Sequence, residues 1–324
     1  MIQITIPLRH DTNILNAYGW KGTMTLRDIV GFAIVTAVLI AAAATPACAE
    51  PAAVYFPSAD GQTQLVGYLF APTTPGPHPA VVLLHGRGGP YSAKVKKNCT
   101  LVAEGTPSDC NASTLSMRYE SWGEYWAAHG YLALLPDSFG PRNKGHGFAR
   151  FTFARFTFGH FIHDDPDRVD VNERTVRPLD AEGALKFLQA RQDVTPSQIF
   201  LQGWSNGGSI TLNVMYRQAQ SASPGFHAAL AFYPRCARRA LISGDYKTVA
   251  PVTVFLGSDD KQVSPIVCHR VLDPAAVHGS ALTLVDYAGA THDFDNPDQK
   301  RQSVPANVAA REDVLKRAAE IFAK

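Results

Sequence analysis

The sequence predicts an α/β fold in which a mostly parallel sheet is covered by helices on both faces. Three observations predict it. Short continuous apolar runs, which are typical of fully buried strands, recur along the chain. Segments with helical spacing of apolar residues alternate with these runs, and such alternation favours a parallel sheet. The runs end in turns rich in glycine, proline and aspartate.

The expected elements begin with a hairpin-like pair of short strands around Ala59-Asp60-Gly61. Strands are expected at Val54–Phe56, Leu65–Phe70, Ala80–Leu84, Tyr131–Leu135, Ile199–Gly203, Ala228–Phe232, Pro251–Leu256 and Leu282–Tyr287. Helices are expected at about Tyr119–His129, Asp180–Arg191, Ile210–Met215 and Asn307–Ala323. No linker interrupts this series, so residues 50–324 are predicted to form a single domain.

The bulk composition excludes some classes of function. The chain has 324 residues, 46% of them apolar, and a formal net charge of +2. That length and composition suffice for one large core. A nearly balanced charge argues against nucleic acid or a charged membrane surface as the main partner.

Residues 1–49 have the pattern of a secretory signal peptide. The stretch Ile29–Ala44 is nearly all apolar, basic residues precede it, and Ala47-Cys48-Ala49 follows it as a cleavage site. Cleavage before Glu50 predicts an exported protein, periplasmic or secreted, with no stable membrane span after cleavage. The upstream region is long, so Met24 is a candidate for the true start. An uncleaved anchor is the alternative, but the run is short for a span of about 20 residues, and the sequence before Cys48 is a poor lipoprotein signal.

Four cysteines remain after the predicted cleavage site. An even number in an exported chain predicts disulfides. Cys99 and Cys110 would close a short loop, while Cys236 follows one predicted strand and Cys268 lies beyond another. The predicted pairs are therefore Cys99–Cys110 and Cys236–Cys268, and four free buried cysteines are the alternative.

The motif with most chemical content is Gly203-Trp204-Ser205-Asn206-Gly207-Gly208. An apolar run ends at Gly203 and a helical pattern begins after Gly208, so a strand, a tight turn and a helix share a Gly-x-Ser-x-Gly motif. Such a turn lifts the Ser205 hydroxyl out of the sheet, near the positive end of the helix dipole. Ser205 is the predicted nucleophile, and a glycine-rich turn with a chance serine is the alternative.

A serine nucleophile needs a base and an acid that orients the base. In the α/β-hydrolase order the acid and then the histidine follow the serine. Asp260 is the predicted acid, since it ends a strand on the same rim, although Asp259 competes and either residue could cap the next helix. His292 is the predicted base in the loop after the last strand, with Asp293 and Asp295 pointing elsewhere.

An oxyanion hole is expected from the turn His85-Gly86-Arg87-Gly88-Gly89, which follows an earlier buried strand. The backbone N–H groups of Arg87 and Asn206 are the predicted donors. His85 is expected to be structural, and a plain glycine turn is the alternative.

Other patterns are less specific. The segment Phe148–Phe158 repeats a five-residue unit of arginine and phenylalanine inside an aromatic-rich excursion at about 143–177. It could line a pocket or form a lid, or be a surface excursion or a dimer contact. His160 and His163 beside Asp164 and Asp165 fit a solvated polar patch better than a zinc site. No metal or cofactor is predicted, since no dinucleotide fingerprint or phosphate loop occurs.

Taken together, these motifs resemble the dienelactone hydrolase family of α/β-hydrolases between about Ala80 and Phe294. The resemblance rests on five stretches: Gly203-Trp204-Ser205-Asn206-Gly207-Gly208, Leu134-Leu135-Pro136-Asp137-Ser138-Phe139-Gly140-Pro141-Arg142, Phe232-Tyr233-Pro234-Arg235-Cys236, Gly257-Ser258-Asp259-Asp260 and Gly289-Ala290-Thr291-His292-Asp293-Phe294. The resemblance implies an α/β-hydrolase fold and a Ser/Cys–Asp–His hydrolase of esters or lactones. Dienelactone-cleaving members carry a cysteine nucleophile and a glutamate where this chain has Ser205 and His85-Gly86, which favours a general serine esterase.

The sequence therefore predicts an exported serine hydrolase that cleaves a small-molecule carboxylic ester or lactone. A peptidase or acyltransferase on the same triad is one alternative. The chain lacks a large gating domain, which disfavours oligopeptidase action. A catalytically inactive binding protein is another alternative, but a binding role alone would not require Ser205, Asp260 and His292 together.

Overall fold

The computed structural model describes residues 50–324 apart from residues 93, 95–98, 148–169, 222 and 224. Ala49–Lys324 forms one compact unit of the chain. The predicted signal peptide at residues 1–49 and the repeat Phe148–Phe158 lie outside the described residues, as do His160, His163, Asp164 and Asp165. Across the part of the chain that is described, no helix has both the length and the apolar character needed to cross a bilayer.

Eight of the described strands form one sheet in the order β1-β2-β4-β3-β5-β6-β7-β8. Strand β1 pairs antiparallel with β2, and β2 pairs antiparallel with β4, whereas the pairs from β4 to β8 are all parallel. The predicted mostly parallel sheet is confirmed. The strands are β1 (Ala52–Pro57), β2 (Gln64–Phe70), β3 (His78–Leu84), β4 (Leu132–Asp137), β5 (Val194–Trp204), β6 (Ala229–Phe232), β7 (Val252–Gly257) and β8 (Leu282–Tyr287).

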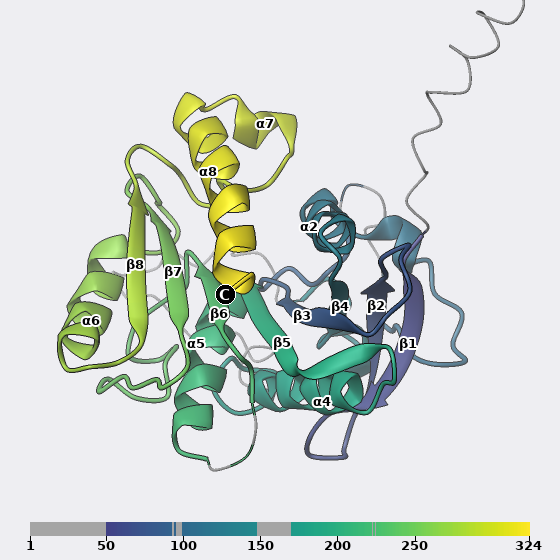
Figure 1. The fold of residues 1–324 in the computed structure, drawn as a ribbon. Coiled ribbons are helices and arrows are strands. Elements are labelled where there is room, and N and C mark those ends of the chain that lie inside the picture. The colour runs from purple at the N-terminus through teal and green to yellow at the C-terminus, as the bar shows by residue number, and fades with distance from the viewer. Residues whose placement is uncertain (1–49, 93, 95–98, 148–169, 222, 224) are drawn as a thin grey trace, which may run out of the picture. The chain divides into compact units, whose positions relative to one another are not determined.

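Helices cover both faces of the sheet (Figure 1). One apolar cluster joins the sheet to α4, α5 and α6, and a second joins the opposite face to α2 and α8. The helices are α2 (Met117–Ala128), α4 (Arg177–Gln189), α5 (Asn206–Ala219), α6 (Pro265–Val277), α7 (Gln299–Gln302) and α8 (Pro305–Phe322). Short 3₁₀ turns lie at Ala112–Thr114 and Gly140–Arg142.

Strand β3 shows why the central runs are continuously apolar. Ala80, Val82 and Leu84 belong to the cluster that contains α4 and α5, while Val81 and Leu83 belong to the cluster on the α2 side. Side chains alternate between the two faces of a strand, so a sheet covered on both faces buries every one of them. None of the five is more than 2% exposed.

The parallel register brings the predicted site segments to one edge of the sheet. Leu84 at the end of β3 pairs with Gly203 near the end of β5. Gly257 at the end of β7 pairs with Tyr287 at the end of β8. Because these strands run in the same direction, the loops that follow them lie along the same edge, where α/β folds place their ligand sites.

Two disulfides lie within the described residues, and they join the pairs that the sequence predicts. Cys99 bonds to Cys110 across 11 residues, and Cys236 bonds to Cys268 across 32 residues. All four side chains are buried. The second bond ties the loop after β6 to α6, so it connects two elements that follow neighbouring strands.

The sequence prediction gave no bounds for helix α6: it expected a helix that Asp259 or Asp260 could cap, and it placed Cys268 just beyond a strand. In the structure Cys268 is a fully buried residue of this helix. Pro274 inside the helix and the β-branched residues of its first half hide the helical pattern. The sequence shows a start signal, since Ser264 precedes a proline at the first helical position.

A pH-sensitive contact joins α6 to the last strand. His269 Nε2 lies 3.0 Å from Asp286 of β8, and Nδ1 lies 3.0 Å from Asp273 one helical turn away. The hydrogen bond to Asp286, helped by that to Asp273, raises the pKa of His269 above its ordinary 6.5. The contact therefore contributes stability fully below pH 6.5 and loses it as pH rises through the folded-state pKa.

We expect His269→Gln to remove this pH dependence from the free energy of unfolding. The effect should not exceed about 1 kcal/mol, because partly exposed ion pairs contribute little. Urea unfolding of both proteins across the histidine range would measure it. Profiles of equal slope for the two proteins would contradict the assignment.

Candidate active site

Ser205 lies at the junction of β5 and α5, in the strained turn that its motif predicts. Its backbone has φ 55° and ψ −112°, a combination that non-glycine residues avoid. Two neighbouring glycines make the turn possible. A Cβ on Gly207 would lie 2.0 Å from the Leu84 carbonyl oxygen, and a Cβ on Gly203 would lie 2.3 Å from the Gly207 carbonyl oxygen.

His292 meets Ser205 from the loop after β8. Its Nε2 lies 3.1 Å from the Ser205 Oγ, across 87 residues of sequence. The imidazole is only 5% exposed, and the Tyr233 ring lies 4.6 Å from it, centroid to centroid. The packing holds the ring in one place, with Nε2 toward the serine.

Asp260, and not Asp259, contacts this histidine. The Asp260 Oδ2 lies 2.6 Å from His292 Nδ1. Its other oxygen accepts from the backbone N–H groups of Gln262 at 2.7 Å and Val263 at 3.0 Å, which fixes the carboxylate. Asp260 is 8% exposed, whereas Asp259 is exposed and bonded to the Ser258 hydroxyl.

These contacts define the protonation pattern of the neutral histidine. The Asp260 carboxylate accepts, so Nδ1 carries the proton and Nε2 presents its lone pair to the Ser205 hydroxyl. An imidazole in this tautomer can take the serine proton as the serine attacks a carbonyl. The geometry is therefore that of an assembled Ser-His-Asp triad.

Asp293 pairs with arginines and not with Ser205 or Asp260, as the sequence predicts, although its carboxylate lies close to His292. Its Oδ1 is 3.9 Å from His292 Nε2, and its carboxylate pairs with Arg118 at 2.5 Å and Arg301 at 2.9 Å. Burial alone would raise the pKa of Asp293, but Arg118, His292 and Arg301 together lower that pKa to about 2. Asp293 is therefore ionised at neutral pH.

Asp295 anchors the same loop, a role that sequence reasoning missed. Its buried carboxylate accepts from Trp122 Nε1 at 2.8 Å, from Trp204 Nε1 at 2.7 Å and from the Tyr233 hydroxyl. The donors come from α2, the end of β5 and the turn after β6, so the anchor joins segments far apart in sequence. An acidic residue three positions after His292 was the only local signal.

The predicted oxyanion turn lies beside Ser205. A Cβ on Gly86 would lie 3.8 Å from the Ser205 Cβ and 3.6 Å from the Tyr119 hydroxyl. The Gly86 N–H donates to that hydroxyl at 2.8 Å. Asn206 is the first residue of α5, so its N–H belongs to the helix N-terminus next to the serine. The turn at Gly86 and the first residue of α5 thus both lie next to Ser205.

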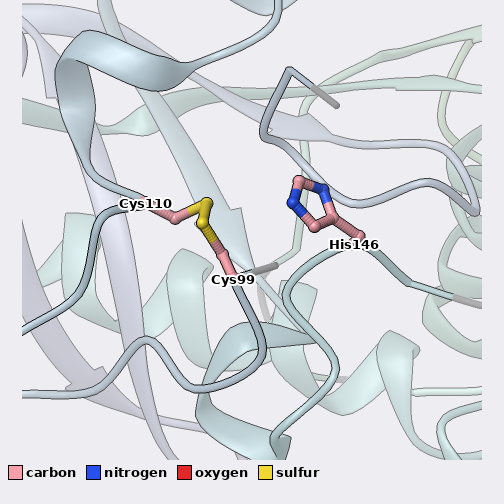
Figure 2. A group of neighbouring side chains, drawn as sticks. All are labelled: Cys99, Cys110 and His146. Atoms are coloured by element: carbon pink, nitrogen blue, oxygen red, sulfur yellow. A yellow bond between two sulfur atoms is a disulfide. The ribbon is translucent and has the colours of Figure 1, made fainter. Parts of the chain in front are cut away.

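One group of described side chains has the spacing of a metal site. The sulfurs of Cys99 and Cys110 and a ring nitrogen of His146 all lie within 4.8 Å of one another (Figure 2). The two sulfurs are joined in a disulfide. Metal ions bind cysteine as the thiolate, which a disulfide does not provide. While Cys99 and Cys110 are bonded to each other, this group therefore offers only the His146 ring as a ligand.

Comparisons with solved structures show the fold. A putative dienelactone hydrolase from Klebsiella pneumoniae subsp. pneumoniae has 17% identity and a TM-score of 0.56, with 84% of this chain and 99% of that chain covered. The dienelactone hydrolase-like promiscuous phosphotriesterase P91 from metagenomic libraries has 18% identity and a TM-score of 0.57, covering 85% and 98%. Esterase 2 from Thermogutta terrifontis with bound propionate has 18% identity and a TM-score of 0.54, covering 85% and 96%.

Sequence comparison identifies the family. No curated protein sequence matches the chain. A family model described as the dienelactone hydrolase family matches residues 119–324, which include Ser205, Asp260 and His292. The matched region is more than half of the chain, and the described strands and helices have the α/β-hydrolase arrangement. The chain therefore belongs to the dienelactone hydrolase family and is a carboxylic ester hydrolase with an α/β-hydrolase fold.

Proposed function

We propose that the chain is an exported serine esterase that hydrolyses small carboxylic esters or lactones through an acyl-enzyme intermediate on Ser205. One observation carries the proposal. His292 lies between Ser205 and Asp260, with contacts of 3.1 Å and 2.6 Å from its two ring nitrogens. The three residues come from loops after three different strands, so their meeting is a property of the fold.

In the acylation step, Ser205 Oγ attacks the ester carbonyl carbon while His292 Nε2 takes its proton. Asp260 holds the Nδ1–H and stabilises the imidazolium that forms. The Arg87 and Asn206 N–H groups donate to the oxyanion of the tetrahedral intermediate. The carbonyl then re-forms, the bond to the leaving oxygen breaks, and His292 returns its proton to the leaving alcohol.

In the deacylation step, a water molecule replaces the alcohol. His292 takes a proton from the water as the water oxygen attacks the acyl carbon of Ser205. Collapse of the second tetrahedral intermediate breaks the bond to Ser205 Oγ, which receives the proton back from His292. The products are one carboxylic acid and one alcohol, and a lactone gives both on one molecule.

Two residues favour general esters over dienelactones as substrates. Ser205 is an alcohol nucleophile that a neutral histidine activates. His85 is a fully buried imidazole and offers no carboxylate at the turn after β3. Both features match an enzyme for ordinary carboxylic esters.

A substrate panel tests the reaction class. The purified chain should hydrolyse p-nitrophenyl acetate and butyrate at least about 100-fold faster than aminoacyl p-nitroanilides of similar size. Addition of an alcohol should not convert the acyl group mainly to a new ester. Faster release from the anilides would support a peptidase, and mainly ester product would support an acyltransferase. Absence of turnover on every compound would reject the proposal.

Export is supported by the chemistry of the cysteines. Both disulfides are buried, and structural disulfides persist in oxidising compartments. Expression in a bacterial host, with mass spectrometry of the product, should give a periplasmic or secreted chain that begins at Glu50. A cytoplasmic product that retains residues 24–49 would contradict export.

A further inference from the structure

In the turn after β3, the carbonyl oxygens of His85 and Gly86 are each in contact with a buried side chain. The His85 carbonyl oxygen accepts from Arg177 Nη2 at 2.8 Å. The Gly86 carbonyl oxygen lies 2.8 Å from the Nδ1 of the His85 ring. His85 has no exposed surface and Arg177 is 1% exposed, so neither contact competes with bulk water.

These carbonyl contacts fix the directions of two N–H groups. In a trans peptide unit the C=O and the following N–H point in opposite directions. The His85 carbonyl belongs to the same unit as the Gly86 N–H, which accordingly points the other way, to the Tyr119 hydroxyl. The Gly86 carbonyl shares its unit with the Arg87 N–H. The Arg87 N–H must therefore point away from the His85 ring.

The Gly86 and Ser138 backbone groups define a single neutral tautomer of His85, because Arg177 Nη2 lies almost equally far from both ring nitrogens, 3.2 Å from Nδ1 and 3.3 Å from Nε2, and so does not select between them. The Gly86 carbonyl can only accept, so Nδ1 carries the ring proton. The Ser138 backbone N–H can only donate, and it lies 3.2 Å from Nε2, so Nε2 is unprotonated. Burial, and after it the Arg177 charge, lower the pKa of His85 well below its ordinary value. The imidazole therefore stays neutral and keeps its proton toward Gly86.

Arg177 also reaches the other side of the nucleophile. Its Nη1 donates to the side-chain oxygen of Asn206, the residue that supplies the second expected oxyanion donor. Its guanidinium lies 4.7 Å from the centroid of the Phe139 ring. Burial lowers the pKa of Arg177 to about 10, so it remains charged at neutral pH. One buried cation thus connects the turn after β3 to the first residue of α5.

We propose that His85 and Arg177 are positioning residues of the oxyanion hole. His85 sets the plane of the Gly86–Arg87 peptide so that its N–H faces the reacting carbonyl, and Arg177 holds this turn at a fixed distance from Asn206. The inference rests on the proposed esterase function. The inference goes further than that function, because it gives a positioning role to two side chains that do not contact substrate.

Two amide substitutions separate the contacts of His85. The amide nitrogen of asparagine reaches the position of Nδ1, whereas the amide group of glutamine reaches that of Nε2. His85→Asn can therefore still donate to the Gly86 carbonyl. His85→Gln keeps an acceptor for the Ser138 N–H but leaves the Gly86 carbonyl without its donor. Both variants bury one neutral amide in place of the imidazole, so their costs in stability should be similar.

The kinetic result should differ between the two variants. With p-nitrophenyl butyrate, His85→Gln should lower kcat by about 100-fold with KM changed by less than about threefold, as for the loss of an oxyanion donor. His85→Asn should keep kcat within about tenfold of the unmodified chain. His78→Asn and His78→Gln are the matched controls, since His78 is also buried but bonds Thr74 at the other end of β3. Neither control should change kcat.

Two outcomes of this comparison would overturn the positioning role. One is equal kcat in His85→Asn and His85→Gln. The other is a rise in KM with kcat unchanged. A lack of ester turnover in the unmodified chain would instead reject the esterase proposal, so the two failures are distinguishable.

A spectroscopic measurement keeps the inference testable if a variant does not fold. In the unmodified chain labelled with ¹⁵N-histidine, His85 should show a protonated Nδ1 and an unprotonated Nε2 from about pH 5 to pH 9, a range in which an ordinary histidine titrates. His85→Asn or His85→Gln, whichever folds, identifies the signal. A protonated Nε2, or titration within that range, would contradict the assignment.

Discussion

Replacement of Ser205 by alanine is expected to lower kcat for ester hydrolysis by about 10⁴- to 10⁶-fold. In the proposed mechanism the substitution removes the atom that attacks the carbonyl, together with its 3.1 Å contact with His292. The residual rate should come from the oxyanion donors and from substrate binding. Initial rates with p-nitrophenyl butyrate at high enzyme concentration would measure the loss.

The stability of the same variant serves as the control. The Ser205 side chain is partly exposed, and its Oγ contact is with His292, so alanine should change the free energy of unfolding by less than about 0.5 kcal/mol. A loss of activity with an unchanged unfolding curve would then show that the substitution affects the reaction and not the stability of the fold. A rate within tenfold of the unmodified chain would show that another residue is the nucleophile.

The second large effect is expected at Asp260. Asp260→Asn should lower kcat by about 10⁴-fold, because an amide beside His292 Nδ1 stabilises the wrong tautomer of the imidazole. The asparagine can still accept from the backbone N–H groups of Gln262 and Val263, so the turn should survive. Asp259→Asn is the matched control, since it makes the same change one residue away at an exposed position.

The pair of variants tests an assignment that sequence reasoning left open. Kinetics of Asp259→Asn should stay within about threefold of the unmodified chain, as for a surface substitution away from the site. A large loss in Asp259→Asn, with Asp260→Asn nearly normal, would reverse the assignment of the acid. Equal losses in both would show that the turn, and not the carboxylate, is what the histidine needs.

Most of the fold and the residues of the proposed triad could be predicted from local sequence patterns. Ser205, Asp260 and His292 each follow an apolar run that the sequence marks as a strand, and parallel strands bring such positions to one edge. Their contacts could thus be anticipated from residues within about ten positions of each. The helix α8 was also visible, since its apolar residues recur at helical spacing.

The contacts that support the triad loop and the turn after β3 could not be predicted from local patterns, because they join residues far apart in sequence. Arg177 and His85 are 92 residues apart, and Trp122 and Asp295 are 173 residues apart. A buried arginine and a buried histidine look like any polar residues until the fold places a carbonyl group beside them. The bounds of helix α6 could not be predicted because its proline and β-branched residues weaken the local pattern, while its packing on the sheet stabilises it.

The most direct measurement is covalent labelling with a fluorophosphonate, followed by location of the adduct by mass spectrometry. The account predicts one adduct per chain, on Ser205, with loss of ester hydrolysis in proportion to labelling. The same treatment of His292→Ala should leave Ser205 unlabelled, because the hydroxyl is then a weak nucleophile. An adduct on another residue that abolishes turnover, or undiminished turnover with Ser205 fully labelled, would contradict the account.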